Sequence, residues 1–353
     1  MRIGQKTNFK FKVEYVEADP SKGFNFPYIM LLPKKMKQNI KIMVECANSA
    51  DYEREGQQSF YAQIKDAKGY ANYISDEQDG ERFNLPYLYQ QLNQPIIIPI
   101  IERCEYKRVG KIIGTEQYLE LDKQGKNTEF YPQQLSRQVM LEREGKFANI
   151  PNQVVAMVED AKVKINKLAT QRKQDVQISK KSGLAGWSSS AVFASRMQLI
   201  CPENFDLCMA FASGGVQPLP LTEYNGQALN YPLGVADFEE LFGKPFNIEE
   251  YSKAKQITVV GSMENPNQYD IAYNARLFDK VTRDLFVKVY GKVDMFRRQC
   301  KIAKILHCNN FTNIYCNVLP HEGHKSYRKE NIDEIIQWLQ DNALEQQEQA
   351  LCK

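Results

Sequence analysis

The sequence has few of the residues and patterns that metal enzymes depend on. Only three histidines occur, at 307, 321 and 324, and none of the eight cysteines forms a C-x-x-C pair. His321 and His324 do not have the H-E-x-x-H spacing of a zinc site, and Gly323 does not favour a helix that would place both imidazoles on one face. We therefore expect neither a metal nor a cofactor, and we expect the cysteines to be buried free thiols of a reducing compartment.

Long apolar runs and blocks of one charge are also missing. No stretch approaches the roughly 20 apolar residues that cross a bilayer, and the first residues lack the apolar core of a signal peptide. The net charge is only +3, from 46 basic and 43 acidic residues, so nothing favours nucleic acid as a partner. These absences predict a cytoplasmic protein and indicate no oligomeric state; a small-molecule acyl substrate is the partner expected from the residues described below.

Strand and helix patterns alternate along the 353 residues. Residues 95–101 are continuously apolar, which is typical of a strand covered on both faces. Residues 154–168 carry one apolar stripe at helical spacing. The alternation predicts the α/β class with a doubly wound, mostly parallel sheet. The predicted strands cover residues 9–16, 28–32, 40–44, 95–101, 176–184, 207–212, 256–260 and 313–318.

Two long excursions interrupt this alternation. Residues 105–150 are polar and turn-rich, and residues 214–255 contain four prolines and many aromatic residues. Connections of this length are usually functional covers or binding loops, so both are candidates for a cap. We expect the aromatic residues of 214–255 to pack onto the body rather than to line an acyl pocket. Since no repeat or linker is present, residues 1–353 are predicted to form a single domain.

A serine-rich turn lies between a predicted strand and a predicted helix. In Gly186-Trp187-Ser188-Ser189-Ser190, Ser188 has a small residue two positions away on either side. This fits the G-x-S-x-G nucleophile elbow, where the turn is too sharp for bulky side chains at those positions. Ser190 replaces the second glycine and is still small. An ordinary Ser-rich turn is the alternative.

A serine hydroxyl needs a neighbouring base, and the base needs an orienting acid. In the order expected for this elbow the acid and then the histidine follow the serine, each after a strand. Glu264 comes just after strand 256–260, with Asp270 as the alternative acid. His324 comes after strand 313–318, and Gly323 before it would let the backbone turn the imidazole inward. His321 is the alternative base.

The negative charge that develops on a carbonyl oxygen requires preorganised backbone N–H donors. One is expected from Ser189, directly after the nucleophile. The other is expected from the loop after strand 40–44, where Asn48 is the first choice. The competing interpretation of Asn48 is an ordinary turn residue.

Together these stretches resemble the α/β-hydrolase superfamily, in particular its esterase-like bacterial members. The resemblance covers most of residues 25–340, and it implies an α/β-hydrolase fold with a Ser-His-acid site. The serine at 190 and a glutamate in place of aspartate depart from the usual pattern. The resemblance is carried by 184–191, by Arg196 with 201–203, by 212–215, by 260–264 and by Gly323-His324.

The function expected from these residues is a serine esterase or lipase-like hydrolase that forms an acyl-enzyme on Ser188. A peptidase or an acyltransferase is the alternative within the same chemistry, because an acyl-enzyme can form from an amide or be discharged to an alcohol. A non-catalytic binding protein on a hydrolase scaffold is the alternative from a different class. It would be favoured if Glu264 and His324 lay far from Ser188.

Overall fold

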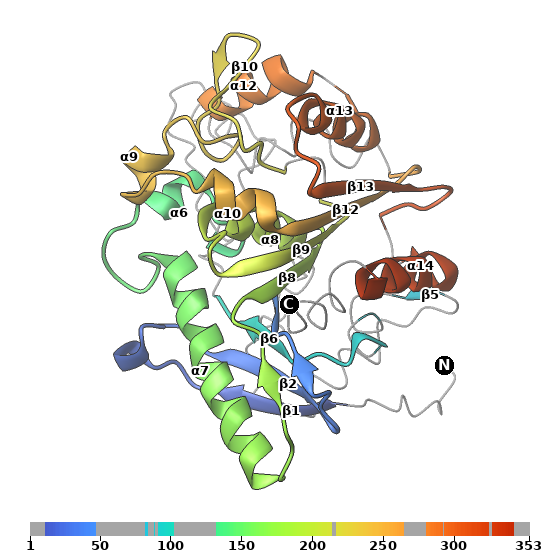
Figure 1. Ribbon diagram of the computed structural model, residues 1–353. Coiled ribbons are helices and arrows are strands. Elements are labelled where there is room, and N and C mark those ends of the chain that lie inside the picture. Colours follow the sequence, from blue (N-terminus) through green and yellow to red (C-terminus); the bar gives the residue numbers. More distant parts are fainter. Residues whose placement is uncertain are drawn as a thin grey trace, which may run out of the picture.

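A computed structural model describes residues 11–46, 82–83, 88, 91–101, 132–213, 217–264, 280–291, 293–324 and 327–341. Its centre is an eight-stranded sheet in the order β1-β2-β6-β4-β8-β9-β12-β13 (Figure 1). β2 is antiparallel to both of its neighbours, and all other pairs are parallel. The strands are β1 (Phe11–Val16), β2 (Tyr28–Pro33), β4 (Met43–Glu45), β6 (Ile96–Pro99), β8 (Ser182–Trp187), β9 (Phe205–Phe211), β12 (Lys255–Gly261) and β13 (Ile314–Leu319).

Helices pack on both faces of this sheet (Figure 1). Successive residues of one strand point to opposite faces: in β6, Ile97 belongs to the core that contains α7 and α8, whereas Ile96 and Ile98 belong to the core that contains α14. Continuous apolar strands are buried on both sides for this reason, and the predicted doubly wound, mostly parallel sheet is confirmed. The helices are α6 (Arg137–Leu141), α7 (Ile150–Gln171), α8 (Ser189–Ile200), α9 (Phe238–Phe242), α10 (Ile248–Lys253), α12 (Lys280–Tyr290), α13 (Met295–Cys308) and α14 (Lys329–Leu339).

Short strand pairs add three small ladders around the main sheet. They are β3 (Asn39–Ile40) with β7 (Gln177–Ile178), β10 (Glu223–Tyr224) with β11 (Gln227–Ala228), and β5 (Arg82–Phe83) with β14 (Tyr327–Arg328). Within the described ranges, no helix has both the length and the apolar character needed to cross a bilayer.

The strand before the serine turn differs from the predicted strand 176–184. Its first part is the separate strand β7, and β8 begins at Ser182 and runs on to Trp187. Small residues lie inside β8, where they let neighbouring groups approach the strand. A Cβ atom on Gly183 would lie 2.6 Å from the side chain of Met43 on β4.

The described part of the 214–255 excursion packs onto the body through its aromatic residues, as expected: Tyr231, Phe238 and Tyr251 belong to the same buried core as residues of α7 and α8. Tyr231 is fully buried and meets Phe242 edge-on at 5.3 Å between ring centroids. Phe238 contacts both Phe242 and Phe246. Residues 105–131 of the other excursion lie outside the described residues, so the proposal that the two excursions form a cap stays a prediction.

The cysteines follow the prediction only in part. Cys46, Cys201 and Cys208 are buried, and burial raises the pKa of Cys201 and of Cys208 to about 12. Cys300 and Cys308 are free thiols, but they are exposed on α13. The prediction of buried thiols is wrong for these two, because they lie on the outward face of an amphipathic helix.

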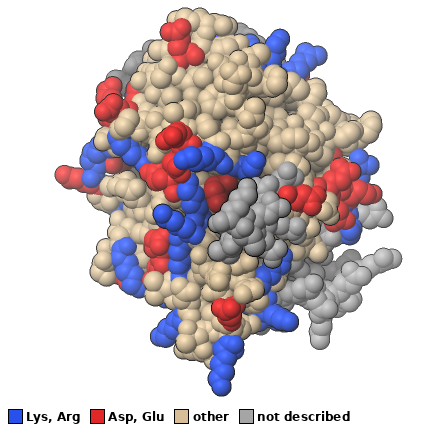
Figure 2. Space-filling view, in the orientation of Figure 1, with Lys and Arg blue, Asp and Glu red and all other residues tan. Residues whose placement is uncertain are grey.

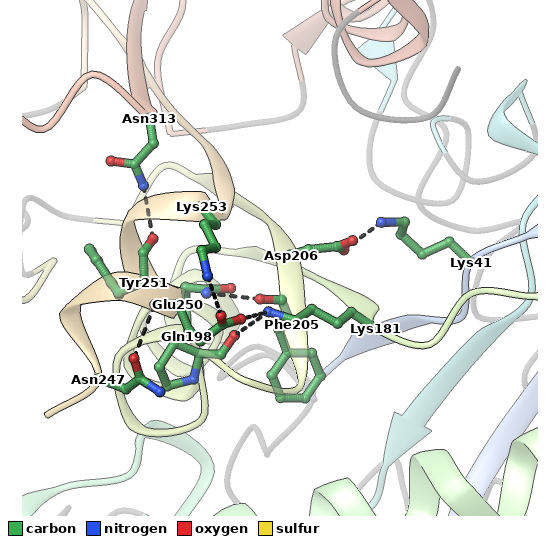
Figure 3. Close-up of polar contacts among 11 residues, drawn as sticks. Lys41, Lys181, Gln198, Phe205, Asp206, Asn247, Glu250, Tyr251, Lys253 and Asn313 are labelled. Atoms are coloured by element: carbon green, nitrogen blue, oxygen red, sulfur yellow. Dashed lines mark hydrogen bonds and ion pairs between the residues drawn. The ribbon is translucent and has the colours of Figure 1, made fainter. Parts of the chain in front are cut away.

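Polar contacts hold the amino ends of the central parallel strands together (Figure 3). Lys181, just before β8, bonds to Glu250 of α10, and Lys253 lies 2.7 Å from the other oxygen of Glu250. Asn313, just before β13, donates to the carbonyl oxygens of Tyr251 at 3.0 Å and Ala254 at 2.9 Å. In Figure 2, Lys and Arg side chains lie beside Asp and Glu mainly across the middle of the face.

The ion pairs of Glu250 predict an acid-sensitive contribution to stability. Hydrogen bonds from Lys181 and then Lys253 lower the pKa of Glu250 from 4.5 to about 2. The unfolded chain therefore binds this proton more tightly, so the contribution is complete above pH 4.5 and is lost as the pH falls toward 2. Glu250→Gln should lower the urea midpoint at pH 7, and its difference from wild type should shrink with acid below pH 4.5. Glu249→Gln, on the neighbouring exposed position, is the control; an equal loss in both variants would contradict this assignment.

Candidate active site

The turn from β8 into α8 holds Ser188 in an unusual backbone conformation. Its φ is 55° and its ψ is −113°, between Trp187 at the end of β8 and Ser189 at the start of α8. A non-glycine residue with positive φ persists only where its surroundings enforce it, and such residues concentrate at functional sites. Gly186 is required here, because a Cβ atom on it would lie 2.1 Å from the carbonyl oxygen of Ser190.

One imidazole joins the serine to a carboxylate. Nε2 of His324 lies 3.0 Å from Oγ of Ser188, and Nδ1 of His324 lies 2.7 Å from Oε2 of Glu264. The Glu264 side chain is 0% exposed and that of His324 is 18% exposed. Both distances are within hydrogen-bond reach, so the structure brings the three residues together in the order serine, histidine, acid.

The parallel sheet accounts for this convergence. Neighbours β8, β9, β12 and β13 are parallel, so their carboxyl ends lie along one edge. Ser188 directly follows β8, Glu264 lies in the turn after β12, and His324 lies in the loop after β13. Residues that are 60 and 136 positions apart therefore meet at this edge.

Backbone hydrogen bonds tie the acid turn to the histidine loop. The N–H of Met263 donates to the carbonyl of Glu322 at 2.7 Å, and the N–H of His321 donates to Oγ of Ser262 at 2.9 Å. A Cβ atom on Gly261 would lie 2.2 Å from the Glu322 carbonyl oxygen, so this glycine permits the close approach. These contacts join the two loops and so help to fix Glu264 relative to His324.

Glu322 is a buried residue that sequence reasoning missed. Its Oε1 accepts hydrogen bonds from the backbone N–H of Arg328 at 2.9 Å, from Nε of Arg328 at 3.0 Å and from Nδ2 of Asn331 at 2.7 Å. It thereby anchors the histidine loop to the start of α14. The sequence signal was weak, since a glutamate between two histidines gives no indication of burial.

The other predicted base, His321, has no hydrogen bond to the serine among the contacts of the described residues. The side chain of His321 is exposed, and its backbone has a φ of 59°. The sharp turn in this loop is therefore made at His321, and the expectation that Gly323 makes it is wrong: Gly323 has no positive φ, and a Cβ atom there would meet only the Met263 carbonyl at 3.5 Å.

Ser189 is held by a buried contact from the end of the 105–150 excursion. Nε2 of Gln134 donates to Oγ of Ser189 at 2.6 Å, and the fully buried Arg196 donates to the Gln134 carbonyl at 2.8 Å. As the first residue of α8, Ser189 has an N–H that no carbonyl of the helix can accept. Asn48 and Asp270 lie outside the described residues, so their suggested roles stay predictions.

A cluster of aromatic rings packs around Trp187, the residue just before Ser188. Trp187 stacks on Phe211 with 6.1 Å between ring centroids and contacts Tyr327 at 4.5 Å. Tyr327 is completely buried, and burial raises its pKa. Since Tyr327 follows the histidine loop, this cluster connects the end of β8 with the segment that carries His324.

The topology decides the fold. Numbered along the chain, the eight strands have the order 1-2-4-3-5-6-7-8 with the second antiparallel, and a serine elbow follows the fifth. The chain has the α/β-hydrolase fold. As is usual for an α/β-hydrolase, the acid and the histidine follow later strands in that order.

No protein-family model matches the chain, and no curated protein matches it in sequence. It is similar to the solved structure of poly(aspartic acid) hydrolase-1 from Sphingomonas sp. KT-1, with 12% identity, 93% and 97% of the two chains covered and a TM-score of 0.49. It is also similar to the poly(3-hydroxybutyrate) depolymerase LpqC from Bordetella parapertussis, with 12% identity, 92% of this chain and 93% of that chain covered, and a TM-score of 0.42. A third similar structure is the siderophore hydrolase EstB from Aspergillus nidulans, with 11% identity, 97% of this chain and 98% of that chain covered, and a TM-score of 0.41.

Proposed function

We propose that this protein is a serine hydrolase that cleaves carboxylic esters or related acyl compounds through an acyl-enzyme on Ser188. The observation that carries the proposal is the imidazole of His324, which contacts Ser188 on one side and the buried carboxylate of Glu264 on the other. A serine, a base and an orienting acid at these distances are the parts that acyl transfer requires.

Acylation begins with the proton of Ser188. Nε2 of His324 takes it while Oγ of Ser188 attacks the substrate carbonyl carbon, and the carbonyl electrons move onto the oxygen. The N–H of Ser189, at the positive end of the α8 dipole, stabilises that oxyanion. When the tetrahedral intermediate collapses, the C–O bond to the alcohol breaks, and His324 gives its proton to the leaving oxygen.

Deacylation repeats these steps with water. His324 takes a proton from water, the hydroxide attacks the acyl carbon, and the acid product leaves Ser188, which regains its proton from His324. Glu264 keeps the imidazole in the tautomer with hydrogen on Nδ1 and stabilises the imidazolium formed in each half-reaction. The second oxyanion donor is assigned to the backbone at Asn48.

Glu264→Gln is expected to reduce kcat strongly while the protein stays folded. Glutamine has nearly the same shape, but its amide can present a donor to Nδ1 and favour the wrong tautomer; the equivalent change in a serine protease costs about 10⁴-fold. Steady-state kinetics of ester hydrolysis measure the effect. Asp270→Asn is the matched control and should be mild, and the reverse ranking would transfer the acid role to Asp270.

Competing acyl donors and acceptors test the reaction class. We expect release of the aryl alcohol from a short-chain aryl ester to exceed release of the aryl amine from the matching anilide, and added alcohol to leave the yield of free acid unchanged. Faster anilide cleavage would indicate the peptidase alternative, and transfer of the acyl group to alcohol would indicate an acyltransferase. If the protein cleaves neither the ester nor the anilide, and no acyl group becomes attached to Ser188, the result would support the non-catalytic alternative.

A further inference from the structure

The serine that replaces the second glycine of the elbow makes contacts that a glycine cannot make. Oγ of Ser190 accepts a hydrogen bond from the backbone N–H of Trp187 at 2.7 Å and donates one to the carbonyl oxygen of Trp187 at 2.9 Å. Ser190 is completely buried. These two hydrogen bonds, here called the Ser190 clasp, connect the first turn of α8 to the last residue of β8 across Ser188.

The strand geometry explains why the hydroxyl fits there. In an extended residue the N–H and the C=O point to the same side of the strand, and a single hydroxyl can both accept and donate. The ladder of β8 with β4 extends to Ala185, paired with Glu45, whereas β8 runs on to Trp187. The Ser190 hydroxyl supplies partners for Trp187 beyond that ladder, and on the opposite edge the N–H of Ser188 donates to the Phe211 carbonyl at 2.8 Å.

We propose that Ser190 is a positioning residue, whose hydroxyl holds Ser188 at its positive φ and so keeps Oγ of Ser188 aimed at His324. The inference rests on the proposed hydrolase function. The turn is fixed at both ends: Gly186 lies against the Ser190 carbonyl, and the clasp closes the same loop through the side chain. A strained residue persists where neighbouring contacts over-determine it, and the clasp adds two contacts around Ser188.

A simpler account is that position 190 needs only a small residue. In that case alanine and glycine should both replace serine without loss of rate, and glycine would restore the usual elbow pattern. If the hydroxyl positions Ser188, both variants should lose rate. The two accounts therefore predict opposite results for Ser190→Ala and Ser190→Gly.

Ser195→Ala is a matched control for the loss of a buried hydroxyl. Ser195 is buried on the same helix, and its Oγ donates to the Ala191 carbonyl at 2.9 Å, away from the turn. Removing either hydroxyl should lower the thermal midpoint by a similar small amount. A difference between the two variants in kcat then reports positioning rather than stability.

The experiment measures three quantities in the full-length wild type, Ser190→Ala, Ser190→Gly and Ser195→Ala proteins. They are the steady-state kinetics of short-chain aryl ester hydrolysis, the rate constant of labelling by a fluorophosphonate, and the hydrogen-exchange rate of the Trp187 amide, localised by mass spectrometry. For both Ser190 variants we expect kcat and the labelling rate to fall by roughly 10- to 100-fold, because a misplacement of about 1 Å costs on the order of 100-fold. KM should not change, and the Trp187 amide should exchange faster.

Wild-type kcat in both Ser190 variants, or an equal fall in Ser195→Ala, would overturn the proposal. A rise in KM with unchanged kcat would also overturn it, since that would place the effect on substrate binding. If the wild-type protein is neither labelled nor active, the hydrolase function fails and the catalytic role of the clasp fails with it. Unchanged exchange of the Trp187 amide in the Ser190 variants of an active enzyme would instead reject the clasp alone.

Discussion

Ser188→Ala is expected to abolish ester hydrolysis, with kcat falling by on the order of 10⁶-fold, as in other enzymes that lose a serine nucleophile. The hydroxyl is the atom that bonds to the acyl carbon, and no other group replaces it. The fold should persist, because alanine keeps the Cβ atom and the position keeps its φ of 55°. Kinetics with an aryl ester and a thermal melt measure both expectations.

Ser189→Ala is the matched control for this change. Ser189 is the adjacent residue, and its Oγ accepts from Gln134 rather than facing His324. Its backbone N–H, the expected oxyanion donor, remains in the variant. We therefore expect a small effect on kcat. An inactive Ser189→Ala protein beside an active Ser188→Ala protein would move the nucleophile by one residue.

His324→Ala should cause a loss of similar size, since the serine then has no base and the leaving group has no acid. Residues of such a set act as a unit, so the single and the double Ser188→Ala/His324→Ala variants should show nearly the same residual rate. His321→Ala is the control on the same loop, because the His321 side chain is exposed and it is His324 that contacts Ser188. An inactive His321→Ala beside an active His324→Ala would show that the other histidine is the base.

The same base predicts the pH profile. An imidazole can accept a proton only in its neutral form, and imidazole side chains ordinarily titrate at about 6.5. We expect kcat/KM to rise with pH as the base loses its proton, and then to level off. A rate that stays flat between about pH 5 and 8 would argue against any histidine base.

The sheet could be predicted because its strands are buried on both faces. A run such as 95–101 has to be apolar at every position when both sides are covered, and the helix patterns between such runs then require a doubly wound arrangement. The ends of strands were less predictable. The predicted strand 176–184 is in fact divided, and Gly183 lies inside β8, where the side chain of Met43 on β4 packs closely against it.

The positions of Ser188, Glu264 and His324 could be predicted from local order, since the carboxyl ends of parallel strands share one edge. The contacts that hold them could not. The Ser190 clasp depends on the fact that β8 continues beyond the last residue that pairs with β4. The anchor at Glu322 depends on its hydrogen bonds to Arg328 and Asn331 at the start of α14. Positive φ at His321 also gives no signal in the sequence, because histidine commonly occupies ordinary backbone regions.

The most direct test of the account is the site of fluorophosphonate attachment. The reagent phosphonylates an activated serine oxygen with loss of fluoride, and it needs no knowledge of the natural substrate. We expect one adduct per chain, mapped by peptide mass spectrometry to Ser188 and absent from the Ser188→Ala and His324→Ala proteins. Attachment elsewhere, or a wild-type protein that stays unlabelled at a pH where imidazole is neutral, would contradict the account.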